Sequence, residues 1–190
     1  MAAPATLTSC DITGKYIMNE KLSDPNVIED ILRVQGVSWA LRKAITLATV
    51  TLSIKHHTDD LGVEHIEVVN TLTGGIPGNT ELSVMDWTDR AHEDYVFGKV
   101  LGRSKRVDSL ETIEDSFLKE SWDVSRGGKE DGVFLLYDES AEEGRPWNAE
   151  QVWGFTVVNG ERRHARRIRI TGKDGKTHYF RLIYNYLGPL

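Results

Sequence analysis

Alternation of apolar and polar residues dominates the chain after residue 48 and predicts β-strands. Between a first strand and this region, the apolar residues of segment 26–48 recur near a period of 3.6, which predicts helix, and Gly36 is expected to divide that helix in two. Strands are expected at 11–19, 49–57, 64–72, 80–87, 93–101, 117–124, 133–138, 151–158, 161–171 and 177–187.

The order of these elements is a strand, a helix pair and then nine strands joined by short links. This order favours an antiparallel up-and-down β-barrel, because closure removes the exposed edges of a meander. All 190 residues are expected to form a single barrel domain of the mainly β class. Two interpretations of the helices at 25–48 stay open: a pair packed on the sheet, or a lid over the barrel mouth. Residues 1–10 are expected to be a loose tail, and 102–116 and 139–150 inserted loops.

The last third of the chain carries two hairpin signals, Asn159-Gly160 and Asp174-Gly175. If each turn holds two residues, the register follows from the turns, and one face of the three strands is defined. That face carries Trp153, Phe155, Val157, Arg162, His164, Arg166, Ile168, Ile170, Tyr179, Arg181, Ile183 and Asn185. Aromatic and cationic residues together are typical of the wall of a partly hydrated cavity, because an unpaired charge in a solid core costs several kcal/mol.

Composition limits the classes of partner. The chain is 39% hydrophobic and 27% charged, and its formal net charge of −6 argues against a protein built to hold nucleic acid. Five arginines lie within residues 162–169, but strand alternation divides them between two faces. No metal site is expected, since the adjacent His56 and His57 point in opposite directions from a strand. The oligomeric state is left open.

Cysteine usage and the N-terminal residues bear on the compartment. Cys10 is the single cysteine, so no intrachain disulfide can form. The first ten residues lack the basic and apolar regions of a secretory signal, and no apolar run approaches the roughly 20 residues that span a bilayer. We therefore expect a cytoplasmic location without stable membrane insertion.

Two short stretches, Gly14-Lys15-Tyr16 and Gly36-Val37-Ser38-Trp39-Ala40-Leu41-Arg42-Lys43, resemble the intracellular lipid-binding proteins, the fatty-acid-binding branch of the calycins. The resemblance implies a first strand, two helices and nine antiparallel strands around a ligand cavity. It also implies a ligand carboxylate held by two arginines and a tyrosine, with an Arg-x-Tyr motif on the last strand. Arg181 stands at the arginine of that motif, but Ile183 replaces the tyrosine and Phe155 the second arginine. The usual fatty-acid clamp is therefore incomplete.

Two functions fit these residues. The first is a carrier that binds a small, largely apolar ligand with a polar or acidic head, without a cofactor. Its expected ligand-binding residues are Arg181, Arg166, Trp153, Phe155, Ile168 and Ile183. The alternative is a cofactor-independent, calycin-fold isomerase or cyclase, in which an arginine polarises a carbonyl and His164 or Tyr179 moves a proton. Each of these polar side chains also has a purely structural interpretation, as a snorkelling arginine or a satisfied core residue.

Overall fold

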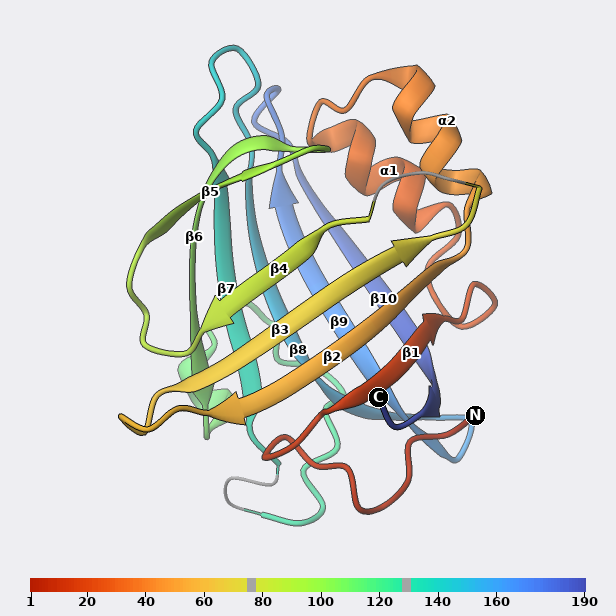
Figure 1. Cartoon of the computed structure of the whole chain (residues 1–190), viewed down its shortest axis with the longest axis vertical. Coiled ribbons are helices and arrows are strands. Elements are labelled where there is room, and N and C mark those ends of the chain that lie inside the picture. The colour runs from red at the N-terminus through yellow and green to blue at the C-terminus, as the bar shows by residue number, and fades with distance from the viewer. Residues whose placement is uncertain (75–77, 128–130) are drawn as a thin grey trace.

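The chain forms one curled antiparallel sheet with two helices over one end (Figure 1). The computed structural model describes residues 1–74, 78–127 and 131–190. Within these ranges, ten strands pair in the order β4-β3-β2-β1-β10-β9-β8-β7-β6-β5. The strands are β1 (Gly14–Met18), β2 (Val50–Thr58), β3 (Glu64–Leu72), β4 (Thr80–Val84), β5 (Arg90–Asp94), β6 (Gly98–Val107), β7 (Val133–Ser140), β8 (Asn148–Val158), β9 (Glu161–Thr171) and β10 (Thr177–Gly188).

The curled sheet returns on itself at one end. The strands β4 and β5 are its two edges, but the segment that follows β4 reaches β6 through a bridge between Asp86 and Lys105. The Ser104 hydroxyl donates to the Val84 carbonyl (3.0 Å), and the Trp87 N–H donates to the Ser104 carbonyl (2.8 Å). These contacts confirm the predicted mainly β, up-and-down, calycin-like fold.

The helix pair confirms the prediction made from Gly36. Helix α1 (Val27–Val34) ends before this glycine, which has a φ of 72°, and helix α2 (Trp39–Leu47) follows it. A positive φ is open to glycine at little cost, so the chain can reverse here. Leu32, Val37 and Ile45 form a small buried cluster that packs on the turn between β5 and β6. This packing places the helices over the barrel end.

The predicted register is correct between β8 and β9. Asn159 and Gly160 both have positive φ, 53° and 78°, as a two-residue hairpin turn requires. Phe155 therefore lies opposite His164, and Trp153 opposite Arg166.

The predicted register is wrong between β9 and β10. Thr171 pairs with Thr177, so the loop holds five residues, 172–176, and of Asp174 and Gly175 only Gly175 has a positive φ. An odd loop length in place of an even one moves every β10 side chain to the other face. Tyr179, Arg181 and Ile183 therefore lie on the outer face, and the inward residues of β10 are Phe180, Leu182, Tyr184 and Tyr186.

The connection between β6 and β7 covers part of the outer face of the sheet. Two predictions for this region are wrong. The polar segment 102–116 is not a loop throughout, because β6 continues to Val107, and segment 117–124 is not a strand. Leu118 and Trp122 are instead buried against the outward side chains of β7 to β10, with the Trp122 indole donating to the Leu118 carbonyl (2.8 Å). Their spacing of four residues, which alternation does not reveal, brings them together in a series of turns.

The arginine cluster of β9 binds this covering segment. Outward-facing Arg167 contacts Glu120 (3.2 Å) and Arg169 contacts Asp115 (3.6 Å), while Arg162 contacts Asp123 (2.8 Å) near the hairpin turn. These arginines thus have acidic partners within the chain. The other expected insertion, 139–150, is shorter, because β7 and β8 extend into it and leave only the loop 141–147. The predicted strand 93–101 is wrong, because these residues span the turn between β5 and β6.

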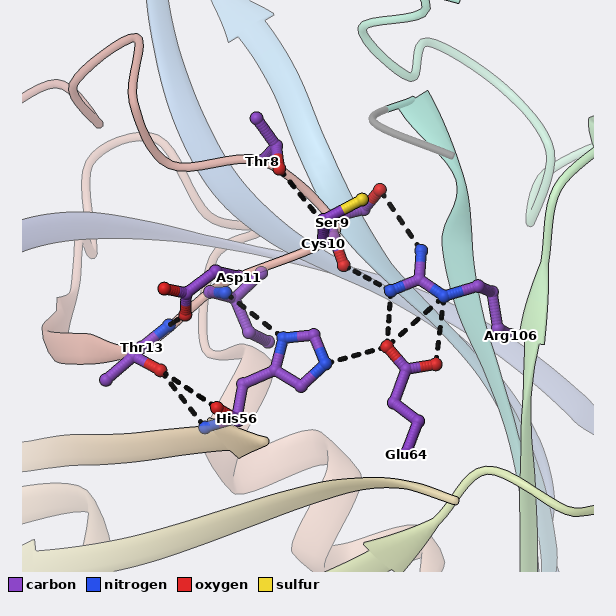
Figure 2. A network of polar contacts seen from close by, with 9 residues as sticks. Thr8, Ser9, Cys10, Asp11, Thr13, His56, Glu64 and Arg106 are labelled. Carbon is purple, nitrogen blue, oxygen red and sulfur yellow. Dashed lines mark hydrogen bonds and ion pairs between the residues drawn. The ribbon is translucent and has the colours of Figure 1, made fainter. Parts of the chain in front are cut away.

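Residues 1–10 do not form a loose tail. Ala3, Leu7 and Ser9 are buried, and Ala3 and Leu7 belong to the cluster that fills the barrel. Figure 2 shows how this segment is held: Arg106 of β6 lies between the Ser9 backbone and the Glu64 carboxylate, and His56 joins the same carboxylate (2.7 Å). Among the described residues, no helix has both the length and the apolar character needed to cross a membrane.

Candidate functional site

A cavity of about 1100 Å³ lies inside the barrel beneath the helices. Apolar side chains of α1, such as Val27 and Ile31, face it from one end, and the inward residues of the sheet form its walls. Buried sheet residues in this lining include Leu52, Leu136, Trp153, Ile168, Ile170, Leu182 and Tyr184. A largely apolar wall with a few convergent polar groups is typical of a small-molecule site.

Arg166 is a buried cation of this wall. It projects inward from β9, it is only 8% exposed, and its guanidinium lies 3.7 Å from the centre of the Trp153 ring and 5.7 Å from that of Tyr184. Nη1 approaches the Glu81 carboxylate at 3.7 Å, whereas Nε and Nη2 have no hydrogen-bond partner among the described residues. Buried donors without partners are costly, so this guanidinium is suited to bind an oxygen atom of a ligand.

Glu81 approaches Arg166 from the opposite wall of the cavity. It belongs to β4, an edge strand that is far from β9 in the strand order. The Asn70 amide of β3 donates to its carboxylate (2.9 Å) and orients it. The sequence places acidic residues in several strands but gives no sign of which arginine each one meets.

A second carboxyl group, Asp138 of β7, lies on the same wall as Trp153. Its carboxylate accepts a hydrogen bond from the Gln151 amide (3.3 Å), whose oxygen accepts one from the Trp153 indole (3.2 Å). Burial, together with the nearby charge of Glu81, raises the pKa of Asp138 to about 7, against the opposing effects of Gln151 and Arg166. Asp138 therefore changes charge near neutral pH.

The predicted site residues divide into three groups, of which the first comprises Arg166, Trp153 and Ile168. All three line the cavity. Their roles in ligand binding stay predictions.

His164 and Phe155 form the second group, on the inner face but below the cavity. The His164 ring packs 5.3 Å from Tyr16 and 5.4 Å from Tyr184, and it is 1% exposed. Burial and the charge of Arg166 lower its pKa to about 3, so the imidazole is neutral and enclosed. His164 is not among the residues that line the cavity.

Tyr179, Arg181 and Ile183 form the third group, which the register of β10 places outside the barrel. Ile183 is fully buried under the covering segment, Tyr179 packs on Phe117 (5.2 Å), and the Arg181 guanidinium donates to the Leu22 carbonyl (3.4 Å). Tyr184 and Leu182 take their place in the cavity wall. With the correct five-residue loop, strand alternation places Leu182 and Tyr184 inward. No local sequence signal identifies Glu81, Asp138 or Gln151 as cavity residues.

The histidines of β2 and β3 have partners other than a metal. His57 stacks on His65 (5.1 Å), and His65 bonds to Asp59 (2.9 Å), while His56 bonds to Glu64. In the described ranges, no group of three or more histidine, cysteine, aspartate or glutamate residues could hold a metal ion.

Comparison with known folds gives a structural neighbour. A chain described as REP1-NXSQ fatty acid transporter superposes with a TM-score of 0.52 and 14% identity, covering 95% of this chain and 98% of its own. At this identity the likeness establishes the fold alone.

Comparison of sequences gives relatives of full length. No family model matches the chain. The pericyclase pydY of Acremonium sp is 28% identical over 195 residues, covering 100% of this chain and 98% of the relative. The probable pericyclase scpY of Mollisia scopiformis is 30% identical over 190 residues, covering 99% and 96% respectively. Because this identity extends over nearly the whole of both chains, the protein belongs to the family of these pericyclases.

Proposed function

We propose that this protein is an enzyme of the pericyclase type, which converts a small, largely apolar substrate by a concerted cyclisation or rearrangement inside the barrel. Two full-length relatives carry the name pericyclase, and they favour the isomerase or cyclase alternative over the carrier that the sequence ranked first. The observation that carries the assignment to the cavity is Arg166, a buried guanidinium with two unpaired nitrogens on an apolar wall.

The first contribution of the cavity is conformational. A flexible substrate must bring the two ends of its reacting π-system together, and this loses conformational entropy. The walls that Trp153, Ile168 and Leu182 provide hold an apolar chain by burial, at roughly 25 cal/mol per Å². A substrate bound in the folded arrangement has lost this entropy before the reaction starts, which is how orientation accelerates intramolecular reactions.

The second contribution is electrostatic. A hydrogen bond from Arg166 to a carbonyl conjugated with the reacting π-system withdraws electron density and makes that partner more electrophilic. The effect is strong because Arg166 is 8% exposed and water competes little for the carbonyl oxygen. The step involves no proton transfer to protein and no net oxidation or reduction, so His164 and Tyr179 have no part in it. The Arg166 side chain is held for this purpose between Trp153 and Glu81.

Turnover of acyclic substrates tests the proposal. Purified protein would be incubated with acyclic conjugated polyenes that carry a conjugated ketone, and the products followed by loss of diene absorbance and by liquid chromatography with mass spectrometry. We expect a cyclic product of unchanged mass, formed faster than without protein. Arg166→Met should lower kcat by about 100-fold, comparable to the loss of one donor to a developing charge, with little change in KM.

Arg169→Met is the matched control. Arg169 belongs to the same strand, but it faces outward and contacts Asp115 and Glu150 at the surface. Its variant should keep the wild-type rate. Equal rates for wild type and Arg166→Met would show that Arg166 does not contribute to the reaction. Recovery of every substrate unchanged would contradict the enzymatic function and favour the carrier.

A further inference from the structure

Of the carboxyl groups that line the cavity, Asp138 has no role in the mechanism above, and Glu81 only positions Arg166. We propose that they make the cavity selective for uncharged carbonyl compounds over carboxylic acids, with Asp138 as the specificity-determining residue. The inference rests on the proposed function, because it describes the substrate class of the same cavity.

The structure holds Asp138 in one place. Gln151 and Trp153 form a chain of two hydrogen bonds that ends on the Asp138 carboxyl group. On the other side lies Gly102 of β6, the pairing partner of Asp138, where a Cβ atom would stand 2.5 Å from Asp138 Oδ1. Any larger residue at position 102 would displace the carboxyl group. The absence of a side chain there gives Asp138 its space in the cavity wall.

The charges next to Arg166 do not favour an anion there. Arg166 is already opposite Glu81, at 3.7 Å, so its charge is partly compensated. Arg90 of β5 also lines the cavity, but Asp86 binds both of its terminal nitrogens at 2.7 Å. A ligand carboxylate near Arg166 would meet one partly compensated guanidinium and two carboxyl groups, and like charges in a poorly hydrated site repel strongly. A ketone or ester accepts the same hydrogen bond from Arg166 without this repulsion.

The protonation of Asp138 makes the selectivity depend on pH. Among the described residues, Glu81 from β4 and Arg166 from β9 act electrostatically on Asp138, His92 from β5 lies beside Gly102, and Arg90 from β5 lines the same cavity. Since the pKa of Asp138 is raised to about 7, it is neutral in weak acid and anionic above neutrality. A simple carboxylic acid loses its proton at roughly pH 5, so it is charged throughout this range. Repulsion of the acid should therefore grow as the pH rises from 6 to 8.

A matched pair of ligands tests the proposal without knowledge of the natural substrate. Decanoic acid and methyl decanoate have the same chain and both have a carbonyl, but only the acid carries a charge. Each would displace Nile red, an uncharged fluorescent carbonyl dye, from the purified full-length protein. At pH 8 we expect the ester to bind at least about ten-fold more tightly than the acid, and the ratio to fall toward pH 6.

Two variants assign the effect to Asp138. Asp138→Asn keeps the shape of the side chain without its charge, and it should reduce the ester-to-acid ratio at pH 8 by about five-fold or more and abolish its dependence on pH. Glu139→Gln is the control, because Glu139 is the next residue of the same strand, faces outward and contacts Tyr137. Circular dichroism and thermal unfolding would verify the fold of each, and the pH series on wild type needs no variant.

The outcomes separate this inference from the proposed function. Equal affinity for acid and ester in wild type, or a ratio that does not change with pH, would refute the proposed selectivity. The proposed function would be unaffected, because it requires only ligand binding and turnover. The same holds if Asp138→Asn behaves like Glu139→Gln. Absence of Nile red and ester binding altogether would overturn both proposals, because the cavity would then not be a ligand site.

Discussion

Glu64→Gln is the substitution whose effect on stability follows most directly from the structure. The Glu64 carboxylate is 19% exposed and accepts hydrogen bonds from the His56 ring (2.7 Å) and from Nε of Arg106 (2.9 Å) (Figure 2). Because the Ile12 N–H donates to Nδ1 of His56 (3.3 Å), the imidazole proton lies on Nε2 and points to Glu64. One carboxylate thus ties β2, β3, β6 and the N-terminal segment together.

The pKa of Glu64 sets the magnitude. Burial alone would raise this pKa, but the hydrogen bonds from His56 and Arg106 and the charge of Arg106 outweigh it and lower the pKa from 4.5 to about 2. At about 1.4 kcal/mol per pH unit, the difference corresponds to about 3 kcal/mol of stability at neutral pH. The folded-state pKa is depressed, so this contribution is present above pH 4.5 and is lost as the pH falls through 2. Near pH 3 the Glu64 carboxylate should still contribute about 1 kcal/mol to the free energy of unfolding.

Chemical denaturation at several pH values tests this reasoning. The free energy of unfolding of wild type should exceed that of Glu64→Gln by about 3 kcal/mol at pH 7, and by about 1 kcal/mol at pH 3. Glu67→Gln is the control on the same strand, opposite Lys55, and should differ from wild type by less than about 0.5 kcal/mol. A difference between wild type and Glu64→Gln that stays constant from pH 7 to pH 3 would refute the electrostatic explanation.

Three further predictions address other parts of the molecule. Trp122→Ala should lower the free energy of unfolding by about 3–5 kcal/mol, because this 7%-exposed indole fills the outer cluster; a loss below about 1 kcal/mol in urea would contradict this packing. The free energy of unfolding of wild type should fall by about 2 kcal/mol between pH 7 and pH 5 because of His164. Its pKa is lowered to about 3 in the folded protein, so below about pH 6.5 only the unfolded chain takes up a proton at this residue. His164→Phe should lack this part of the loss in parallel denaturation curves, and identical pH dependence would show that His164 does not contribute. Arg145→Ala removes donors to the Gln35 and Val96 carbonyls (3.3 and 3.5 Å), so amide exchange of Gly36 and Val37 should rise about five- to ten-fold, and unchanged exchange would mean that Arg145 does not hold the helices.

The two hairpins of the last three strands show where local prediction holds and where it fails. Asn159-Gly160 forms the expected two-residue turn, whose geometry depends only on the residues within it. In the second hairpin, contacts with distant segments accompany the longer loop: a Cβ on Gly172 would lie 3.0 Å from the Val34 side chain of α1, and Lys173 donates to the Gly144 carbonyl (3.4 Å). Such contacts are absent from any local pattern.

The sequence by itself determined most strands of the meander, the helix pair with its break at Gly36, and the shared face of Trp153, Arg166 and Ile168. These features follow from backbone periodicity and from turn chemistry, which act over a few residues. Only the tertiary structure decided which acids meet Arg166, since Glu81 and Asp138 come from strands on different parts of the sheet. It also decided that Arg181 lies outside, because the five-residue loop sets the face of β10, and Gly172 and Lys173 of that loop contact α1 and the loop 141–147.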